Sequence, residues 1–217
     1  MPSQLSRRDF LKLGYGAAAT AALACGGLGY FATQSPTIAE LDTSLKGTQP
    51  MNKILVTYAT RAGSTVDVAK TIGETLNATG ASVDVRPVKG VTTLQGYDAV
   101  VVGSAVRMGH WLPEAVDFVT KNQAQLGRLP TAFFTVHLLN CDDDAKSRAA
   151  REAYTAPVRQ ILQPKNEIFF AGKMDFSKLS FFDGAIAKMV GGSERDLRNW
   201  DAIRGWAQGL PALLGYA

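Results

Sequence analysis

The sequence predicts an α/β fold with helices on both faces of a parallel sheet, and two observations support this prediction. Five short runs of strand-forming residues alternate with segments in which apolar residues recur at helical spacing. Several of these runs are almost continuously apolar, which is typical of strands buried on both faces. Strands that alternate with helices imply βαβ units. We therefore expect a three-layer sandwich with a five-stranded parallel sheet in the order 2-1-3-4-5.

The expected elements follow one another from residue 53 to residue 214. The first strand is KILVTY (53–58), and an amphipathic helix over 64–79 follows it. The other strands are SVDVRPV (82–88), DAVVVG (98–103), TAFFTV (131–136) and EIFFAG (167–172). Three more helices are expected: LPEAVDFVTKN (112–122), residues 144–162, which Pro157 should break or kink, and WDAIRGWAQGLPALL (200–214).

Two segments precede this domain, which we place at residues 51–217. Residues 6–12, SRRDFLK, are followed by an apolar stretch rich in Ala and Gly, and together they resemble a twin-arginine export signal. We therefore expect residues 1–32 to be a signal or membrane anchor recognised by the twin-arginine translocase, and residues 33–50 to be a linker. The resemblance implies a protein that is periplasmic or anchored to the outer face of the inner membrane.

The fate of the signal is open at this point. Ala22-Leu23-Ala24 has the small residues of a cleavage site. The uncharged span from Leu13 to Ala32 is also about long enough to cross a bilayer, which takes ~20 residues. Cleaved and anchored forms both fit the sequence.

Charge and cysteine content exclude some classes of partner. The formal net charge is +4, and residues 1–32 supply +2 of it through Arg7, Arg8 and Lys12 against Asp9. The remaining +2 is too little to indicate a nucleic-acid partner. The two cysteines, Cys25 and Cys141, form neither a disulfide framework nor a metal cluster, so we expect no metal site.

The stretch ATRAGST, residues 59–65, lies where the first strand ends and the first helix begins. The first N–H groups of a helix lack partners within the helix, and the helix dipole is positive there, so a phosphate can bind if side chains do not obstruct it. Thr60, Ser64 and Thr65 add hydroxyl donors, and Gly63 allows close approach. An ordinary turn capped by Ser or Thr explains the same residues.

Two further loops are expected at the same edge of the sheet: GSAVRMGHW (103–111) after the third strand and TVHLLN (135–140) after the fourth. Together, ILVTYATRAGST, VVVGSAVRMGHW, PTAFFTVHLLN and MVGGSERD resemble the menaquinone-dependent protoporphyrinogen oxidases, over roughly residues 52–210. That group has a flavodoxin-like fold and uses FMN and a quinone acceptor.

The resemblance implies which residues bind FMN. Carried over by position, the phosphate would contact Thr60, Arg61, Ala62, Gly63, Ser64 and Thr65. The isoalloxazine ring would be bordered by Ser104, Ala105, Val106, Arg107, Met108, Gly109 and His110, and by Val136, His137, Leu138 and Leu139. Arg107 and His110 are candidate catalytic residues, since a positive charge near the ring would stabilise reduced flavin and a histidine could relay protons. His110 could equally be a surface histidine.

Residues 173–196 exceed a minimal five-strand fold and carry one apolar stripe that includes Phe181 and Phe182. The stripe indicates either a helix that closes over the core or a lip that contacts a hydrophobic substrate or the membrane surface. We expect an exported FMN-dependent oxidoreductase that passes electrons between a reduced, protoporphyrinogen-like substrate and a quinone. The alternatives are a flavodoxin-type electron carrier that exchanges electrons with a redox partner protein, and a flavin-free binding domain.

Overall fold

The computed structural model describes residues 38–48, 53–178 and 194–215 of the chain. The chain divides into two compact units. The main unit comprises Ile38–Asp175 and Ser193–Ala217, and the other comprises Met1–Thr37 and Phe176–Gly192. Of the second unit, only the short 3₁₀ helix Phe176–Lys178 lies within the described residues. The expected export signal, and Phe181 and Phe182 of the expected lip, lie outside them.

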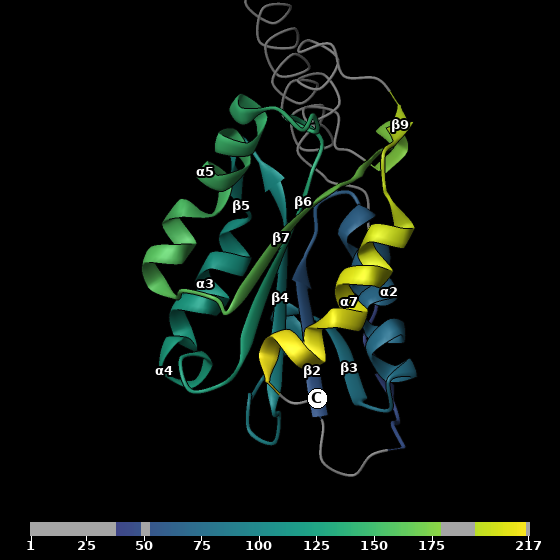
Figure 1. Cartoon of the computed structure of the whole chain (residues 1–217), viewed down its shortest axis with the longest axis vertical. Coiled ribbons are helices and arrows are strands. Elements are labelled where there is room, and N and C mark those ends of the chain that lie inside the picture. The colour runs from purple at the N-terminus through teal and green to yellow at the C-terminus, as the bar shows by residue number, and fades with distance from the viewer. Residues whose placement is uncertain (1–37, 49–52, 179–193, 216–217) are drawn as a thin grey trace, which may run out of the picture. The chain divides into compact units, whose positions relative to one another are not determined.

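The main unit is built on a sheet whose strand order is β1-β3-β2-β4-β6-β7 (Figure 1). Five of these strands pair in parallel with their neighbours. They are β3 (Ser82–Pro87), β2 (Lys53–Ala59), β4 (Ala99–Arg107), β6 (Thr131–His137) and β7 (Asn166–Ala171). Numbered along the chain, these five have the order 2-1-3-4-5, which confirms the predicted fold class.

Two short strands extend this sheet. β1 (Thr43–Leu45) pairs antiparallel with β3 at one edge, and β5 (His110–Trp111) folds back on β4 as a hairpin. β1 lies within the segment predicted to be a linker, so that prediction is wrong for this part of the chain. The Tyr58 hydroxyl fixes the segment by accepting a hydrogen bond from the N–H of Leu41 at 2.7 Å and donating one to its C=O at 3.0 Å.

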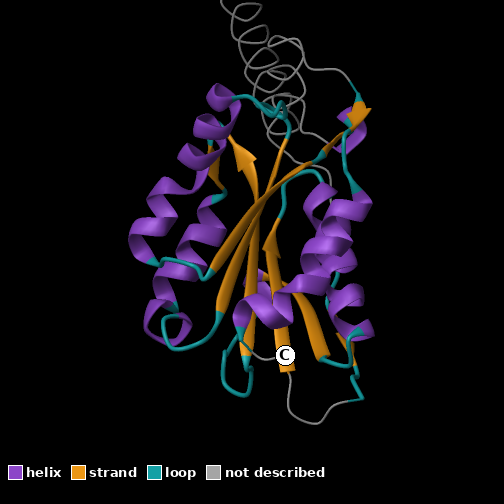
Figure 2. Ribbon diagram, in the orientation of Figure 1, coloured by secondary structure: helices purple, strands orange, loops and turns teal. Residues whose placement is uncertain are grey.

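Helices cover both faces of the sheet (Figure 2). α2 (Ser64–Ala78) and α7 (Trp200–Leu214) pack on one face. The other face carries α3 (Pro113–Lys121), α4 (Gln123–Leu126) and α5 (Ala145–Ile161). Each helical layer forms a separate apolar core with the sheet, because the strand side chains alternate between the two faces. The 3₁₀ helix Val88–Gly90 follows β3.

Helix α5 corrects part of a second expectation, because it runs as one helix from Ala145 to Ile161 and is not broken at Pro157. Pro157 lies on the exposed face of the helix, where water can satisfy the carbonyl group that loses its N–H partner. After β7, the strand β8 (Lys173–Met174) pairs antiparallel with β9 (Arg195–Asp196). Within the part of the chain that the structure describes, no helix is both long and apolar enough to cross a membrane.

Candidate flavin site

The loop between β2 and α2 is a tight turn at the carboxyl end of the sheet. The Oγ1 of Thr60 accepts a hydrogen bond from the N–H of Gly63 at 3.1 Å, and the carbonyl of Gly63 accepts one from the N–H of Val66 at 2.9 Å. Gly63 has a φ of 87°, a left-handed conformation that side chains other than glycine's adopt with strain. The position therefore favours glycine for its backbone conformation.

Thr65, the second residue of α2, is the residue that fits an anion most clearly. Its side chain is 1% exposed, and its Oγ1 is buried without a hydrogen-bond partner. A buried hydroxyl without a partner is unfavourable, so such groups usually mark a missing water, ion or ligand. The N–H groups of Ser64 and Thr65 also have no partner within the helix because they lie in its first turn. A phosphate group can accept hydrogen bonds from both kinds of donor at this turn, the hydroxyl and the N–H groups.

The predicted phosphate ligand Ser64 has a second role. Its Oγ accepts a hydrogen bond from the N–H of Lys173 at 2.9 Å, which ties the loop to the segment after β7. The neighbouring Gly172 N–H donates to the carbonyl of His137 at 2.7 Å. Gly172 needs to be small, since a Cβ there would lie 2.8 Å from Cγ1 of Val136. The Ser64 hydroxyl can still donate its own proton, so both roles are compatible.

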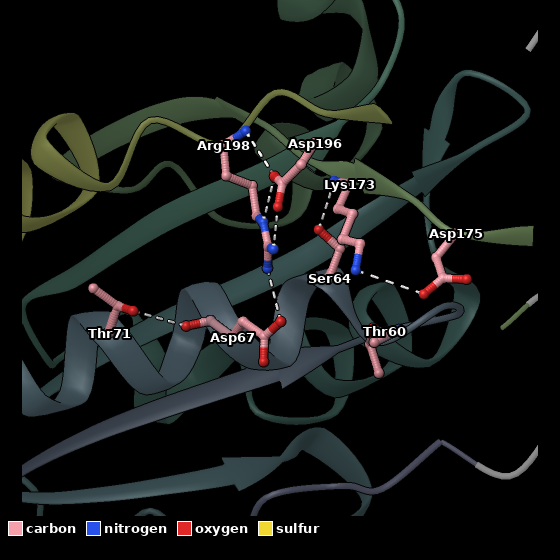
Figure 3. Close-up of polar contacts among 9 residues, drawn as sticks. Thr60, Ser64, Asp67, Thr71, Lys173, Asp175, Asp196 and Arg198 are labelled. Carbon is pink, nitrogen blue, oxygen red and sulfur yellow. Dashed lines mark hydrogen bonds and ion pairs between the residues drawn. The ribbon is translucent and has the colours of Figure 1, made fainter. Parts of the chain in front are cut away.

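A set of charged side chains surrounds this helix start, and sequence reasoning missed it (Figure 3). Arg198 bridges Asp67, at 2.7 Å, and Asp196, at 2.5 Å, and its guanidinium also stacks over the ring of Trp200. The hydrogen bonds from Arg198 lower the pKa of Asp196 to about 2. Asp67 lies in the first turn of α2, where its charge would oppose a bound phosphate. Arg198 offsets that charge.

Lys173 adds a cation next to the same loop. Its ammonium group lies 3.6 Å from a carboxylate oxygen of Asp175, and 42% of its side chain is exposed. Because its backbone N–H is bonded to Ser64, the base of this side chain is fixed beside the turn. Lys173 is therefore a candidate partner for a phosphate group, although no motif in the sequence indicates this lysine.

The second predicted loop is a two-residue hairpin between β4 and β5. Arg107 and His110 face each other across it, and Met108 and Gly109 form the turn with φ values of 53° and 79°. Positive φ at both central positions gives a turn whose twist matches the two strands. The turn directs Met108 into solvent, where it is 78% exposed. Arg107 and His110 are exposed as well.

Two residues on either side of this hairpin, Ser104 and Trp111, are interior. Ser104 is fully buried, and its hydroxyl accepts from the N–H of Leu112 at 3.0 Å and donates to the carbonyl of Ala105 at 2.8 Å. Trp111 is 4% exposed, and its indole N–H donates to the hydroxyl of Thr135 at 2.8 Å. Both side chains hold the hairpin against the body of the domain. A contact between Ser104 and a ligand would have to come from its backbone.

The third predicted loop combines interior and exposed residues. Val136 and His137 are each 4% exposed, and the Nδ1 of His137 lies 2.8 Å from the carbonyl oxygen of Leu139. Burial lowers the pKa of His137 below its usual value, so the ring is neutral at pH 7. Leu139, by contrast, is 62% exposed. Burial raises the pKa of the Cys141 thiol, which makes it a poor nucleophile.

The register of the sheet brings the three loops together. Ala59 of β2 lies beside Ser104 of β4, and Ala105 of β4 lies beside Val136 of β6. All three loops therefore leave neighbouring strands at the same edge, which we call the cofactor edge. A model of the flavodoxin-domain family matches residues 55–197, a span that contains all three loops. The chain belongs to the flavodoxin-domain family.

Relatives of this flavodoxin-domain protein include enzymes. It is 26% identical over 162 residues to the protoporphyrinogen IX dehydrogenase [quinone] of Escherichia coli strain K12, which covers 72% of this chain and 90% of the relative. It is 29% identical over 175 residues to the protein of the same name from Leishmania major, covering 74% of this chain and 75% of the relative. The flavodiiron core Flv1 of Synechocystis sp. PCC6803 has a similar fold, with 10% identity, a TM-score of 0.50, and coverage of 76% of this chain and 36% of that one.

Members of the flavodoxin-domain family bind flavin, and the residues present here fit FMN. The unpartnered Thr65 hydroxyl and the N–H groups at the start of α2 suit the phosphate. The hairpin over 107–110 and the exposed Leu139 flank the adjoining part of the cofactor edge, where the ring would lie. Two residues are added to the predicted set. Lys173 is bonded to Ser64 of the phosphate loop, residues 59–65, and Arg198 is bonded to Asp67 in the first turn of α2.

Proposed function

We propose that this chain is an exported, FMN-dependent oxidoreductase that passes electrons between a reduced, protoporphyrinogen-like substrate and a quinone. The observation that carries the proposal is the match along most of the chain to two proteins named protoporphyrinogen IX dehydrogenase [quinone], together with three loops at one sheet edge. The bound flavin would supply the redox chemistry. The protein would bind it, orient it and tune its potential.

The residues of the chain divide this work. Thr65, Ser64 and the N–H groups of the first turn of α2 would hold the phosphate, with Lys173 beside them. Arg107 and His110, exposed on the hairpin, are the candidates for stabilising negative charge and for moving a proton at the edge of the ring. His137 is unsuited to proton transfer in this state, since it is buried and its Nδ1 is engaged with Leu139.

A flavodoxin-type electron carrier is the second candidate. The observation that favours it is the exposed acidic pair Asp142 and Asp143 next to the third loop, because acidic residues near a flavin suit docking to a basic protein partner. A carrier exchanges electrons with a protein and has no turnover with an organic substrate. An enzyme reacts with porphyrinogen and quinone without a protein partner.

Purification of the folded chain followed by a flavin absorbance spectrum tests the cofactor. Turnover is then measured with protoporphyrinogen and menaquinone analogues. Flavin with quinone-dependent porphyrinogen oxidation supports the enzyme, and flavin without such turnover supports the carrier. A protein that binds no FMN, even when FMN is added to the unliganded chain, refutes both.

Export depends on a different part of the chain. We expect Arg7 and Arg8 to be recognised by the twin-arginine translocase, which carries folded proteins and so would permit flavin to bind before export. Replacement of both arginines by lysine should leave folded protein in the cytoplasm. Unchanged periplasmic or membrane-bound protein in cell fractions would contradict the export proposal and leave the flavin proposal untouched.

A further inference from the structure

The chain enters the main unit at the cofactor edge. β1 runs antiparallel to β3, so the residues that precede β1 lie at the carboxyl end of the sheet. Leu41 is bonded there to the Tyr58 hydroxyl, near the end of β2. Ile38 lies beside the phosphate loop, with its Cγ2 3.5 Å from the position of a Cβ on Gly63. Whatever precedes Ile38 is therefore attached next to the proposed flavin site.

The same edge presents the two most exposed large apolar side chains among the described residues. They are Met108, at 78%, and Leu139, at 62%. Each lies three residues beyond a member of the neighbouring pair Ala105 and Val136, so their loops project from adjacent strands. Positive φ values at Met108, and at Asn140 after Leu139, shape both tips. Two apolar side chains held outward at the tips of neighbouring loops are available for contact with an apolar partner at this edge.

The length of the preceding chain limits what can cover this surface. The uncharged span from Leu13 to Ala32 ends only five residues, 33–37, before Ile38. Five extended residues reach at most about 18 Å. Strand β4 alone has nine residues, so the carboxyl ends of the strands lie roughly 30 Å from their amino ends. If residues 13–32 lie in a bilayer, this tether keeps the cofactor edge within about 18 Å of the bilayer surface, whereas it sets no such limit on the opposite edge.

We propose that the cofactor edge faces a phospholipid bilayer in the full-length protein, with residues 13–32 retained as the anchor and Met108 and Leu139 in contact with the lipid. The inference rests on the proposed export of the chain. It deepens the proposed function, because a quinone dissolved in the membrane would then meet the flavin site at the membrane surface. Of the cleaved and anchored forms that both fit the sequence, the proposal therefore selects the anchored one.

The test measures which edge touches lipid. A single cysteine is placed at Met108→Cys or Leu139→Cys on the cofactor edge, in full-length protein that carries Cys25→Ala and Cys141→Ser. Leu213→Cys is the matched control, since Leu213 is an exposed leucine, at 48%, near the end of α7 and thus at the opposite edge. Gln95→Cys, in the turn before β4, is a polar control at that edge. Each cysteine carries an environment-sensitive dye, and the proteins are reconstituted in phosphatidylethanolamine–phosphatidylglycerol vesicles that contain a phospholipid with a spin label on its acyl chain.

We expect the dyes at 108 and 139 to lose most of their fluorescence to the quencher, and the dyes at 213 and 95 to retain theirs. Equal quenching at both edges, or no quenching at 108 and 139, would overturn the proposal. A mature chain that lacks residues 1–24 by mass spectrometry would overturn it as well. The readout requires neither flavin nor turnover, so the absorbance spectrum and the porphyrinogen assay judge the proposed function separately.

Discussion

Replacing Thr65 with valine should change stability and FMN affinity in opposite directions. Valine has nearly the shape of threonine but no hydroxyl. In the unliganded protein the Thr65 hydroxyl is buried without a partner, which costs about 1–3 kcal/mol, so Thr65→Val should stabilise the unliganded fold by up to that amount. If the same hydroxyl donates to the phosphate of FMN, the variant loses a hydrogen bond to a charged group. Such a bond contributes about 1.5–3 kcal/mol, which corresponds to roughly 10- to 150-fold in affinity.

Riboflavin and Thr57 provide the controls for this prediction. Riboflavin lacks the phosphate, so its affinity should be the same in Thr65→Val and the unsubstituted protein. The Thr57 hydroxyl is also buried without a partner, but it lies inside β2, away from the turn. Thr57→Val should therefore raise the free energy of unfolding without lowering FMN affinity. Urea denaturation and flavin fluorescence titration measure the two quantities. If Thr65→Val keeps full FMN affinity, the phosphate is not at this turn.

Three further predictions concern charged and titrating groups. Lys173→Met should lower FMN affinity by about 2- to 5-fold and leave riboflavin affinity unchanged, and the difference should shrink in high salt, because the ammonium group is partly exposed. Arg198→Met should lower the melting temperature at pH 7, and its difference from the unsubstituted protein should narrow on acidification. Arg198 lowers the pKa of Asp196 to about 2. The stabilisation from this pair is therefore present above the unfolded pKa, near 4, and is lost as the pH falls towards 2. His137→Gln should make the free energy of unfolding less pH-dependent between pH 7 and pH 5. Burial lowers the pKa of His137, so the unsubstituted protein loses stability as the pH falls through the unfolded value near 6.5. Denaturant curves that shift equally with pH in the variant and in the unsubstituted protein would contradict this.

The fold could be predicted because its signals are local. A nearly continuous apolar run such as KILVTY becomes a strand buried on both faces, and the alternation of strands with helices determines the parallel sheet. β1 was missed because three residues with one exposed position carry no periodic signal. It forms through partners elsewhere, namely its register with β3 and the bond from Leu41 to Tyr58.

The site could be predicted only where its residues follow a strand directly. The three loops are placed by the parallel order of β2, β4 and β6, so their meeting at one edge follows from topology. Side-chain direction does not follow from topology. Ser104, Val136 and His137 were predicted to border the ring, yet their side chains are interior, because each belongs to the buried part of its strand. The lip around Phe181 stays a hypothesis.

The residues that no motif indicated share one property, which is that they reach the start of α2 from distant parts of the sequence. Lys173 is bonded to Ser64 across 109 positions, and Arg198 to Asp67 across 131. Both pairs connect the first turn of α2 to the β8–β9 ribbon. The two strands of this ribbon are the first and last residues of the 173–196 segment. If a phosphate binds at the first turn of α2, we expect it to restrict this ribbon as well, since Ser64 and Asp67 of that turn also hold the ribbon. Loss of either contact should then weaken the coupling between phosphate binding and the ribbon without removing the loop itself.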